Sequence, residues 1–224
     1  MVLYYNGLEM DGSSPYIFID FDGVLNALNQ EAVYVGKEPL TELKMVFRNP
    51  KEWKVEVHDI DNEFHYTPTA EGKAVLNNKT YTVQWSEEMV HDLNEVLALG
   101  KITPIVLSTW RQVGAEEVMP LIGLNVPSSN WLDFGDSTLD AYEAEKLMAL
   151  ENLYLGLKRE SNPTPSFVWI DDNATNYFHN LNNPAEQKLA QEFSAPSSLI
   201  VKPKARKGIS RYEMTHIREF VEAL

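Results

Sequence analysis

The chain has 224 residues, more than the roughly 100 to 200 of an average domain, which predicts one domain with an insertion or two small domains. Hydrophobic residues make up 44% and aromatic residues 11%, which excludes a disordered or low-complexity chain. The net charge of −14 argues against wrapping nucleic acid through general positive charge, and the absence of cysteine excludes disulfides, thiol catalysis and cysteine-based zinc sites.

The N-terminal sequence MVLYYNGLEMDG lacks a charged segment followed by an apolar run. No stretch of about 18 apolar residues occurs elsewhere. We therefore expect no signal peptide, no membrane partner, no disulfide-linked partner and a cytoplasmic location.

Short apolar runs alternate with capped helices along the chain, which is typical of a parallel sheet with helices on both faces. The expected strands are residues 16–20 (YIFID), 103–108 (TPIVLS), 124–126, 166–171 (SFVWID) and 198–202 (SLIVK). Helix starts are predicted at Ser86, at Asp140 with Glu143, at Asn183 before Pro184, and at Ser210 with Glu213. The fold class is therefore α/β.

The stretch between residues 27 and 84 has a different pattern. Polar and apolar residues alternate at 54–58, 63–67 and 79–85, and the turn residues DIDN separate the first two of these segments. This favours a small antiparallel sheet. We predict an α/β core of residues 1–26 and 85–224, interrupted by a β-rich cap at residues 27–84.

Two carboxylates follow the first predicted strand. Asp20 and Asp22 are two positions apart, and Gly23 comes next. Positions i and i+2 of an extended strand point the same way, so both acids are expected at the carboxyl edge of the sheet, where open α/β sheets bind ligands. One is suited to be a nucleophile or metal ligand and the other a proton donor and acceptor. The alternative is an acid pair that only leads into a turn.

Polar residues also follow two further predicted strands. Ser108 or Thr109 could donate a hydrogen bond to a phosphate oxygen, with Arg111 adding a charged contact, or the hydroxyls could cap a helix. Asp171 and Asp172 are adjacent acids, which repel each other unless a divalent cation binds them or both are solvated in a loop.

Taken in order, DFDGVLN, LSTWR and WIDDN, with GIS before the last helix, resemble the motifs of the haloacid dehalogenase (HAD) superfamily of phosphohydrolases. More narrowly, they resemble the HAD domain of the Swiss Army Knife RNA repair proteins. The resemblance spans residues 16–224, and the insertion lies where that superfamily places a cap. It implies a HAD-like Rossmannoid three-layer sandwich with a central parallel sheet and a small β-rich cap insertion.

The resemblance also implies a Mg²⁺-dependent phosphomonoester hydrolase. Asp20 would attack the phosphoryl group to form an aspartyl-phosphate, and Asp22 would protonate the leaving group and then activate water. Asp20, the backbone carbonyl of Asp22 and Asp171 would hold Mg²⁺, with Asp172 as a direct or water-mediated ligand. Ser108 would bind a phosphoryl oxygen, with Thr109 as the alternative.

A lysine before the last acidic motif belongs to the same pattern. We prefer Lys146, near the start of the helix that follows Asp140, over Lys158 near its far end. The alternative is a solvated lysine among Glu143, Glu145 and Glu151.

The segment KPKARKGISR, residues 202–211, holds five basic residues and no acid. It follows the last predicted strand, so Lys204, Arg206 and Lys207, with Thr109 and Arg111, are the expected substrate-binding residues. A solvated loop is the alternative. The basic segment favours a nucleic-acid end or a nucleotide as substrate, whereas the acidic net charge favours a phosphorylated small metabolite. A catalytically silent HAD-fold module that binds a partner is the remaining alternative.

Overall fold

A six-stranded sheet forms the centre of the molecule. The computed structural model describes residues 2–5, 8–11, 14–26, 43–49, 52–58, 65–76, 78–133, 142–160, 165–174, 198–205 and 207–224. The strand order is β5-β4-β10-β9-β3-β8, where β3 is Tyr16–Ile19, β8 Thr103–Val106, β9 Phe167–Ile170 and β10 Ser198–Val201. These last four strands are parallel, which confirms the predicted α/β class.

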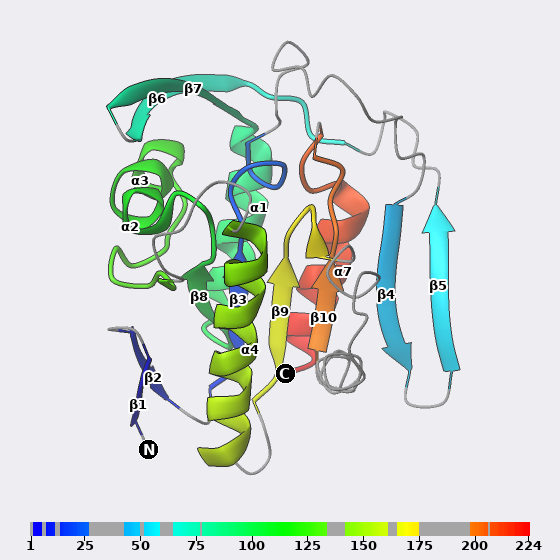
Figure 1. Ribbon diagram of the computed structural model, residues 1–224. Coiled ribbons are helices and arrows are strands. Elements are labelled where there is room, and N and C mark those ends of the chain that lie inside the picture. The colour runs from blue at the N-terminus through cyan, green and yellow to red at the C-terminus, as the bar shows by residue number, and fades with distance from the viewer. Residues whose placement is uncertain are drawn as a thin grey trace.

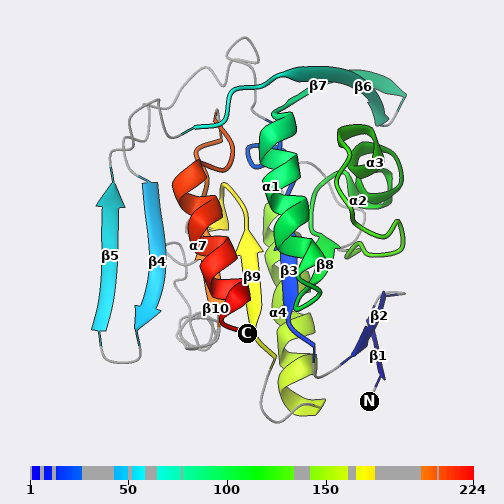
Figure 2. The ribbon, with the colours of Figure 1, turned by 180° about the vertical axis from the view of Figure 1, so that it is seen from behind.

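Helices cover both faces of the parallel strands. Figures 1 and 2 show α4 (Tyr142–Glu160) on one face, and α1 (Glu87–Ala98) and α7 (Arg211–Glu222) on the other. Successive side chains of a strand point to opposite faces of the sheet, so alternate residues pack against the helices on each face. Tyr16, Phe18 and Trp169 pack with α4, whereas Ile17, Ile19 and Ile170 pack with α1 and α7.

The helix ends confirm two of the expected caps. The Ser86 side chain accepts a hydrogen bond from the Met89 backbone N–H, and Ser210 and Glu213 form a reciprocal capping box. The predicted starts at Asp140 and at Asn183 lie outside the described residues. Three short elements follow β8, namely α2 (Arg111–Val113), a π-helical turn (Gly114–Val118) and α3 (Met119–Ile122).

The predicted strand at residues 124–126 is wrong. These residues have no strand geometry, and the segment that pairs with the edge of β8 comes after a turn at Pro127. Val106 donates its backbone N–H to Asn130 and accepts one from Leu132, so residues 130–132, and not 124–126, pair with the edge of β8.

The three remaining strand pairs are antiparallel hairpins. β1 (Val2–Tyr5) pairs with β2 (Leu8–Asp11). β4 (Leu43–Asn49) and β5 (Glu52–His58) pair with each other and extend the sheet beyond β10. β6 (Ala70–Leu76) and β7 (Lys79–Trp85) form a separate sheet at the end of the molecule toward which β9 points (Figure 1).

The predicted alternating strands at 54–58 and 79–85 correspond to β5 and β7. In the third predicted strand, 63–67, residues 65–67 form only one isolated bridge, between His65 and Ser210, and residues 63 and 64 lie outside the described residues. The division into core and cap stays a prediction.

Two buried titratable side chains flank Ser210. Glu213 is fully buried, and its Oε2 accepts hydrogen bonds from the Ser210 N–H (2.7 Å) and hydroxyl (2.8 Å). Burial raises the pKa of Glu213 to about 7. His65 is also buried, and neither ring nitrogen has a hydrogen-bond partner among the described residues. Burial, together with the charges of Lys207 and Lys204, lowers the pKa of His65 to about 4.

We expect Glu213→Gln to change the pH dependence of stability. The folded protein binds a proton at Glu213 more tightly than the unfolded chain, so this contribution to stability is complete below about pH 4.5 and is lost as the pH rises to about 7. Gln stays neutral and keeps the capping geometry. Between about pH 4.5 and 7 the wild type loses this contribution and the variant does not. The free energy of unfolding of the variant, relative to that of the wild type, should therefore increase over this range by up to about 3 kcal/mol. Urea titrations at a series of pH values measure the difference.

His65→Gln is the matched control with the opposite sign. Neutral His65 favours folding, so its contribution to stability is lost as the pH falls from about 6.5 to about 4. The difference between His65→Gln and wild type should change over that window in the direction opposite to the change seen with Glu213→Gln. A difference between Glu213→Gln and wild type that is constant from pH 4.5 to 7 would contradict the prediction.

Candidate functional site

A tight turn follows β3 and carries the first two acids. Asp20 comes directly after the strand, and the backbone N–H groups of Leu25 and Asn26 both donate to the carbonyl of Phe21, at 2.9 and 3.0 Å. Gly23 has a φ of +74°, and a Cβ at this position would lie 2.7 Å from Cγ of Asp172. Glycine is therefore required for the turn to pack against the acidic residues that follow β9.

Three carboxylates meet at the carboxyl ends of β3 and β9, which are neighbours in the sheet. One oxygen from each of Asp20, Asp171 and Asp172 lies within 4.8 Å of the others. Asp20 is buried, Asp171 is fully buried and Asp172 is half-buried. Backbone N–H groups hold the first two, because Phe21 donates to Asp20 Oδ1 at 2.7 Å and Asn173 donates to Asp171 Oδ1 at 2.8 Å.

The ammonium group of Lys146 reaches this cluster from α4. Its Nζ donates to Oδ2 of Asp20 at 2.7 Å and forms an ion pair with Oδ2 of Asp171, also at 2.7 Å. Only 3% of Lys146 is exposed. By contrast, Lys158 is exposed in the last turn of the same helix, so of the two lysines weighed from the sequence only Lys146 contacts the acids.

The cluster has the donors and the charge that a divalent cation requires. Burial raises the pKa of Asp171, and the Lys146 ammonium opposes that effect. Three carboxylates and one ammonium leave a formal charge of −2. Carboxylate oxygens are the ligands that Mg²⁺ and Ca²⁺ prefer. Asp20, Asp171 and Asp172 therefore fit such an ion by chemistry and by charge.

Asp22 faces a different environment. Its Oδ1 accepts a hydrogen bond from the Asn26 side-chain amide at 2.8 Å, and its Oδ2 accepts one from the Trp110 indole N–H at 2.9 Å. Burial raises the pKa of Asp22, while these two hydrogen bonds favour the charged form and oppose the increase. A carboxylate with a raised pKa is suited to exchange protons near neutral pH.

The polar residues after β8 lie beside the first acid along the sheet edge. Leu107 donates its N–H to the Ile19 carbonyl at 2.9 Å and continues the register level with Asp20, so Ser108 comes one residue further along the same edge. Ser108 is fully buried, and its Oγ accepts a hydrogen bond from the Trp110 N–H at 3.4 Å. Thr109 and Arg111 are half-buried. Arg111 has a φ of +50°, a strained conformation for a residue with a Cβ and a common feature of functional sites.

The predicted basic segment packs against the turn that carries Asp22. The Ile209 N–H donates to the Val24 carbonyl at 3.0 Å, and a Cβ on Gly208, whose φ is +68°, would lie 2.5 Å from the same oxygen. Lys204 and Lys207 are half-buried in this loop, close enough to His65 to lower its pKa. Arg206 lies outside the described residues. The loop is thus held at the carboxyl edge of the sheet.

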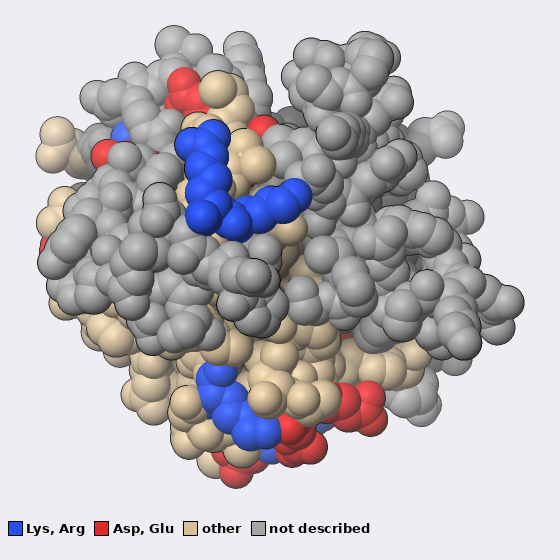
Figure 3. Space-filling model, turned by 90° about the horizontal axis from the view of Figure 1, so that it is seen from below, with Lys and Arg blue, Asp and Glu red and all other residues tan. Residues whose placement is uncertain are grey.

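The opposite end of the molecule carries no continuous basic surface among the described residues. Figure 3 views this end from below, where the visible Lys and Arg side chains are divided among separate groups and the lowest group is bordered by acidic side chains. No helix within the described part of the chain is both long enough and apolar enough to span a membrane.

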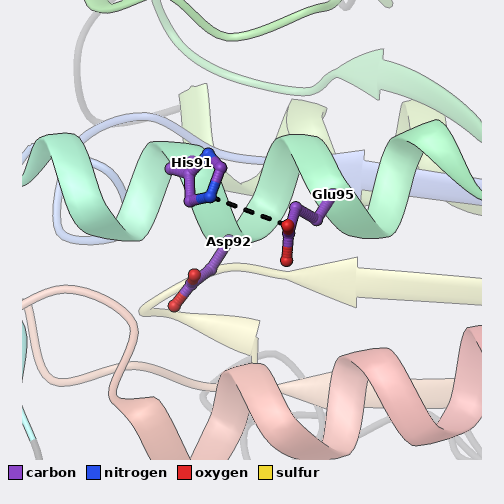
Figure 4. Close-up of side chains that lie close together, drawn as sticks. All are labelled: His91, Asp92 and Glu95. Atoms are coloured by element: carbon purple, nitrogen blue, oxygen red, sulfur yellow. Dashed lines mark ion pairs between the residues drawn. The ribbon is translucent and has the colours of Figure 1, made fainter.

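A second acidic cluster lies on α1 and was not expected from the sequence. His91, Asp92 and Glu95 approach one another there (Figure 4). Each of the three already has a partner. His91 pairs with Glu95 at 3.6 Å, Asp92 accepts a hydrogen bond from the Tyr66 hydroxyl, and Glu95 pairs with Arg218 at 3.0 Å. We assign this cluster to the packing of α1 against its neighbours.

Most of the predicted residues within the described ranges lie along one edge of the sheet. Direct contacts join Asp20, Lys146 and Asp171, and Asp172 completes the acidic cluster. Sequence reasoning missed the roles of Trp110 and Asn26 in binding Asp22. Both lie within the quoted motifs, LSTWR and DFDGVLN, but nothing local to those motifs indicates that the two segments meet. Comparison with known proteins identified no matching family model, no matching curated protein and no matching solved structure.

Proposed function

We propose that this chain is a HAD-like, Mg²⁺-dependent phosphomonoester hydrolase that acts through an aspartyl-phosphate intermediate. The observation that carries the proposal is the buried group of Asp20, Asp171 and Lys146 at the ends of adjacent parallel strands. Further support comes from the strand order, because β3, which precedes Asp20, lies between β8, which precedes Ser108, and β9, which precedes Asp171.

In the first half of the reaction, an Asp20 oxygen attacks phosphorus and the bond from phosphorus to the leaving alcohol breaks. Asp22, protonated at this stage, transfers its proton to the departing oxygen. In this proposal Lys146 and Ser108 bind phosphoryl oxygens, and the charge of Lys146, which contacts Asp20, offsets the repulsion between the carboxylate and the phosphate.

In the second half, Asp22 accepts a proton from water while the water oxygen attacks phosphorus. The bond between phosphorus and Asp20 then breaks and inorganic phosphate leaves, which restores the Asp20 carboxylate and leaves Asp22 protonated again for the next cycle. Asp20, Asp171, Asp172 and the Asp22 carbonyl would hold Mg²⁺, which supplies positive charge that stabilises the transferring phosphoryl group.

The substrate proposed is a nucleic-acid end or a nucleotide. The support for it is the loop with Lys204 and Lys207, because the same loop packs through Gly208 and Ile209 on the turn that carries Asp22. A small phosphorylated metabolite is the competing substrate class, because such a substrate needs no contact with the basic loop in addition to the contact of its phosphate group with the site.

A substrate panel tests the proposal. We expect phosphate release with Mg²⁺ and none with a chelator, from a panel of 3′- and 5′-phosphorylated oligonucleotides, mononucleotides and sugar phosphates. For an oligonucleotide, kcat/KM should fall as salt is raised and should fall again in Lys204→Gln/Lys207→Gln, while Lys101→Gln, at the opposite sheet edge, is the control. Turnover of sugar phosphates alone, without salt dependence, would favour the metabolite class, and no release from any ester would refute the hydrolase.

A further inference from the structure

Both oxygens of the Asp22 carboxylate are bound by side chains that no proposed catalytic step uses. Asn26, on the same turn, donates to Oδ1, and the indole N–H of Trp110, 88 positions away, donates to Oδ2. Each carboxylate oxygen has two acceptor sites, so these two hydrogen bonds leave one site on each oxygen for a proton. The two donors fix the plane of the carboxylate without blocking proton transfer.

Strand β7 in turn contacts both donors. The Gln84 backbone N–H donates to the Asn26 side-chain carbonyl at 3.1 Å. Tyr81 packs edge-to-face on the Trp110 ring, with the ring centroids 5.4 Å apart and the planes at 73°. On its other side the Trp110 ring packs on Phe21, with the centroids 5.6 Å apart and the planes at 81°. The indole is therefore held between the β6–β7 hairpin and the turn that carries Asp22.

We propose that Trp110 and Asn26 are positioning residues for Asp22, and that the β6–β7 hairpin holds them in place through Tyr81 and Gln84. The inference rests on the proposed function, in which Asp22 is the proton donor, and it names the residues that orient Asp22 for that role. A general acid must lie about 2.6 to 3.2 Å from the oxygen that it protonates, and a carboxylate free to rotate about its Cβ–Cγ bond spends little time there. Gln84 contacts Asn26 through its backbone N–H. This contact should therefore survive a change of the Gln84 side chain but not the loss of strand β7.

The leaving group separates positioning of the acid from general damage to the site. p-Nitrophenolate is a stable anion and leaves without being protonated. An alkoxide is a poor leaving group, so an alkyl phosphate needs a proton on the departing oxygen. The ratio kcat/KM reports only the steps up to release of the first product, which is where Asp22 acts as an acid. Loss of Asp22 orientation should therefore reduce kcat/KM for an alkyl phosphate and leave that for p-nitrophenyl phosphate nearly unchanged.

The test compares the two esters in Trp110→Phe, which removes the indole N–H and keeps a ring between Phe21 and Tyr81. We expect kcat/KM for the alkyl phosphate to fall about tenfold or more, with a change of less than about threefold for p-nitrophenyl phosphate. Asn26→Leu should show the same selective loss. Tyr81→Ala, at a partly exposed position where folding is less at risk, should show it to a smaller degree. Among the described residues the side-chain donors to Asp22 are Asn26 and Trp110, so Trp131→Phe, which removes a different indole N–H, is the control and should change neither value.

Equal losses with both esters in Trp110→Phe, or no loss with either, would overturn the positioning role while leaving the proposed function standing. If Trp110→Phe selectively lowered kcat/KM for the alkyl phosphate and Tyr81→Ala did not, the proposal that the β6–β7 hairpin holds the two positioning residues would be overturned. A wild-type protein that hydrolyses neither ester would overturn the proposed function and this inference with it.

Discussion

Replacing Asp20 by Asn is expected to lower the turnover of p-nitrophenyl phosphate at least about a thousandfold while the protein stays folded. An amide oxygen is too weak a nucleophile to form the phosphoenzyme. The shape of the side chain is kept, and its oxygen can still accept the hydrogen bond from the Phe21 N–H. The amide would meet the Lys146 ammonium less favourably than the carboxylate does, but Lys146 keeps its ion pair with Asp171. Turnover and the midpoint of thermal unfolding, measured on the same preparation, separate loss of chemistry from loss of fold.

Glu117→Gln is the control for Asp20→Asn, since Glu117 is exposed on the π-helical turn after α2. Asp22→Asn provides the complementary observation. With an activated ester the first half of the reaction needs no acid, whereas the second half needs a base, so this variant should accumulate the phosphorylated protein, detectable by intact mass. Wild-type rates in Asp20→Asn would reject the aspartyl-phosphate mechanism.

Lys146→Met is expected to remove activity and to destabilise the protein by about 3 to 5 kcal/mol when no divalent cation is present. Met replaces the buried stem of the lysine but not its charge, and it leaves Asp20 and Asp171 facing each other without a counter-ion. Added Mg²⁺ should recover part of that stability, because the carboxylates themselves are intact. Urea unfolding with a chelator and with Mg²⁺ measures both effects.

Lys158→Met is the matched control on the same helix. Its side chain is exposed, and substitutions at such positions usually change stability by no more than about 0.5 kcal/mol. If Lys146→Met and Lys158→Met had the same stability and activity, the role of Lys146 as counter-ion would be contradicted. Asp171→Asn extends the comparison, since it should weaken the stabilisation of the otherwise wild-type protein by Mg²⁺.

The strands that carry the site could be predicted because their local signal is strong. Continuous apolar runs that end in acids or hydroxyls predicted the positions of β3, β8 and β9 in the sequence. The capping residues Ser86 and Ser210 predicted where α1 and α7 begin. Of the two lysines weighed from the sequence, Lys146 contacts Asp20, because the first turns of α4 lie near the carboxyl edge of the sheet, and its catalytic role stays a prediction.

Contacts between segments far apart in the sequence could not be predicted. Nothing periodic in the chain indicates that Trp110 binds Asp22, or that β4 and β5 extend the sheet beyond β10. The run at residues 124–126 failed for a related reason. Its apolar residues are buried, as a strand's would be, but Leu124 and Val126 pack in the core of the α1 face without forming a ladder. An apolar pattern predicts burial more reliably than it predicts hydrogen bonding.

The ion pair between Asp20 and Lys146 has a consequence for biosynthesis. The lysine is made 126 residues after the aspartate, and Asp171 and the strand that precedes it come later still. A nascent chain that ends before α4 can pair β3 with β8 but has neither the ammonium nor the second flanking strand, so Asp20 stays hydrated until α4 and β9 have left the ribosome. Burial of the proposed nucleophile and assembly of the rest of the site are therefore one late event, and truncated forms of the chain should have no partial activity.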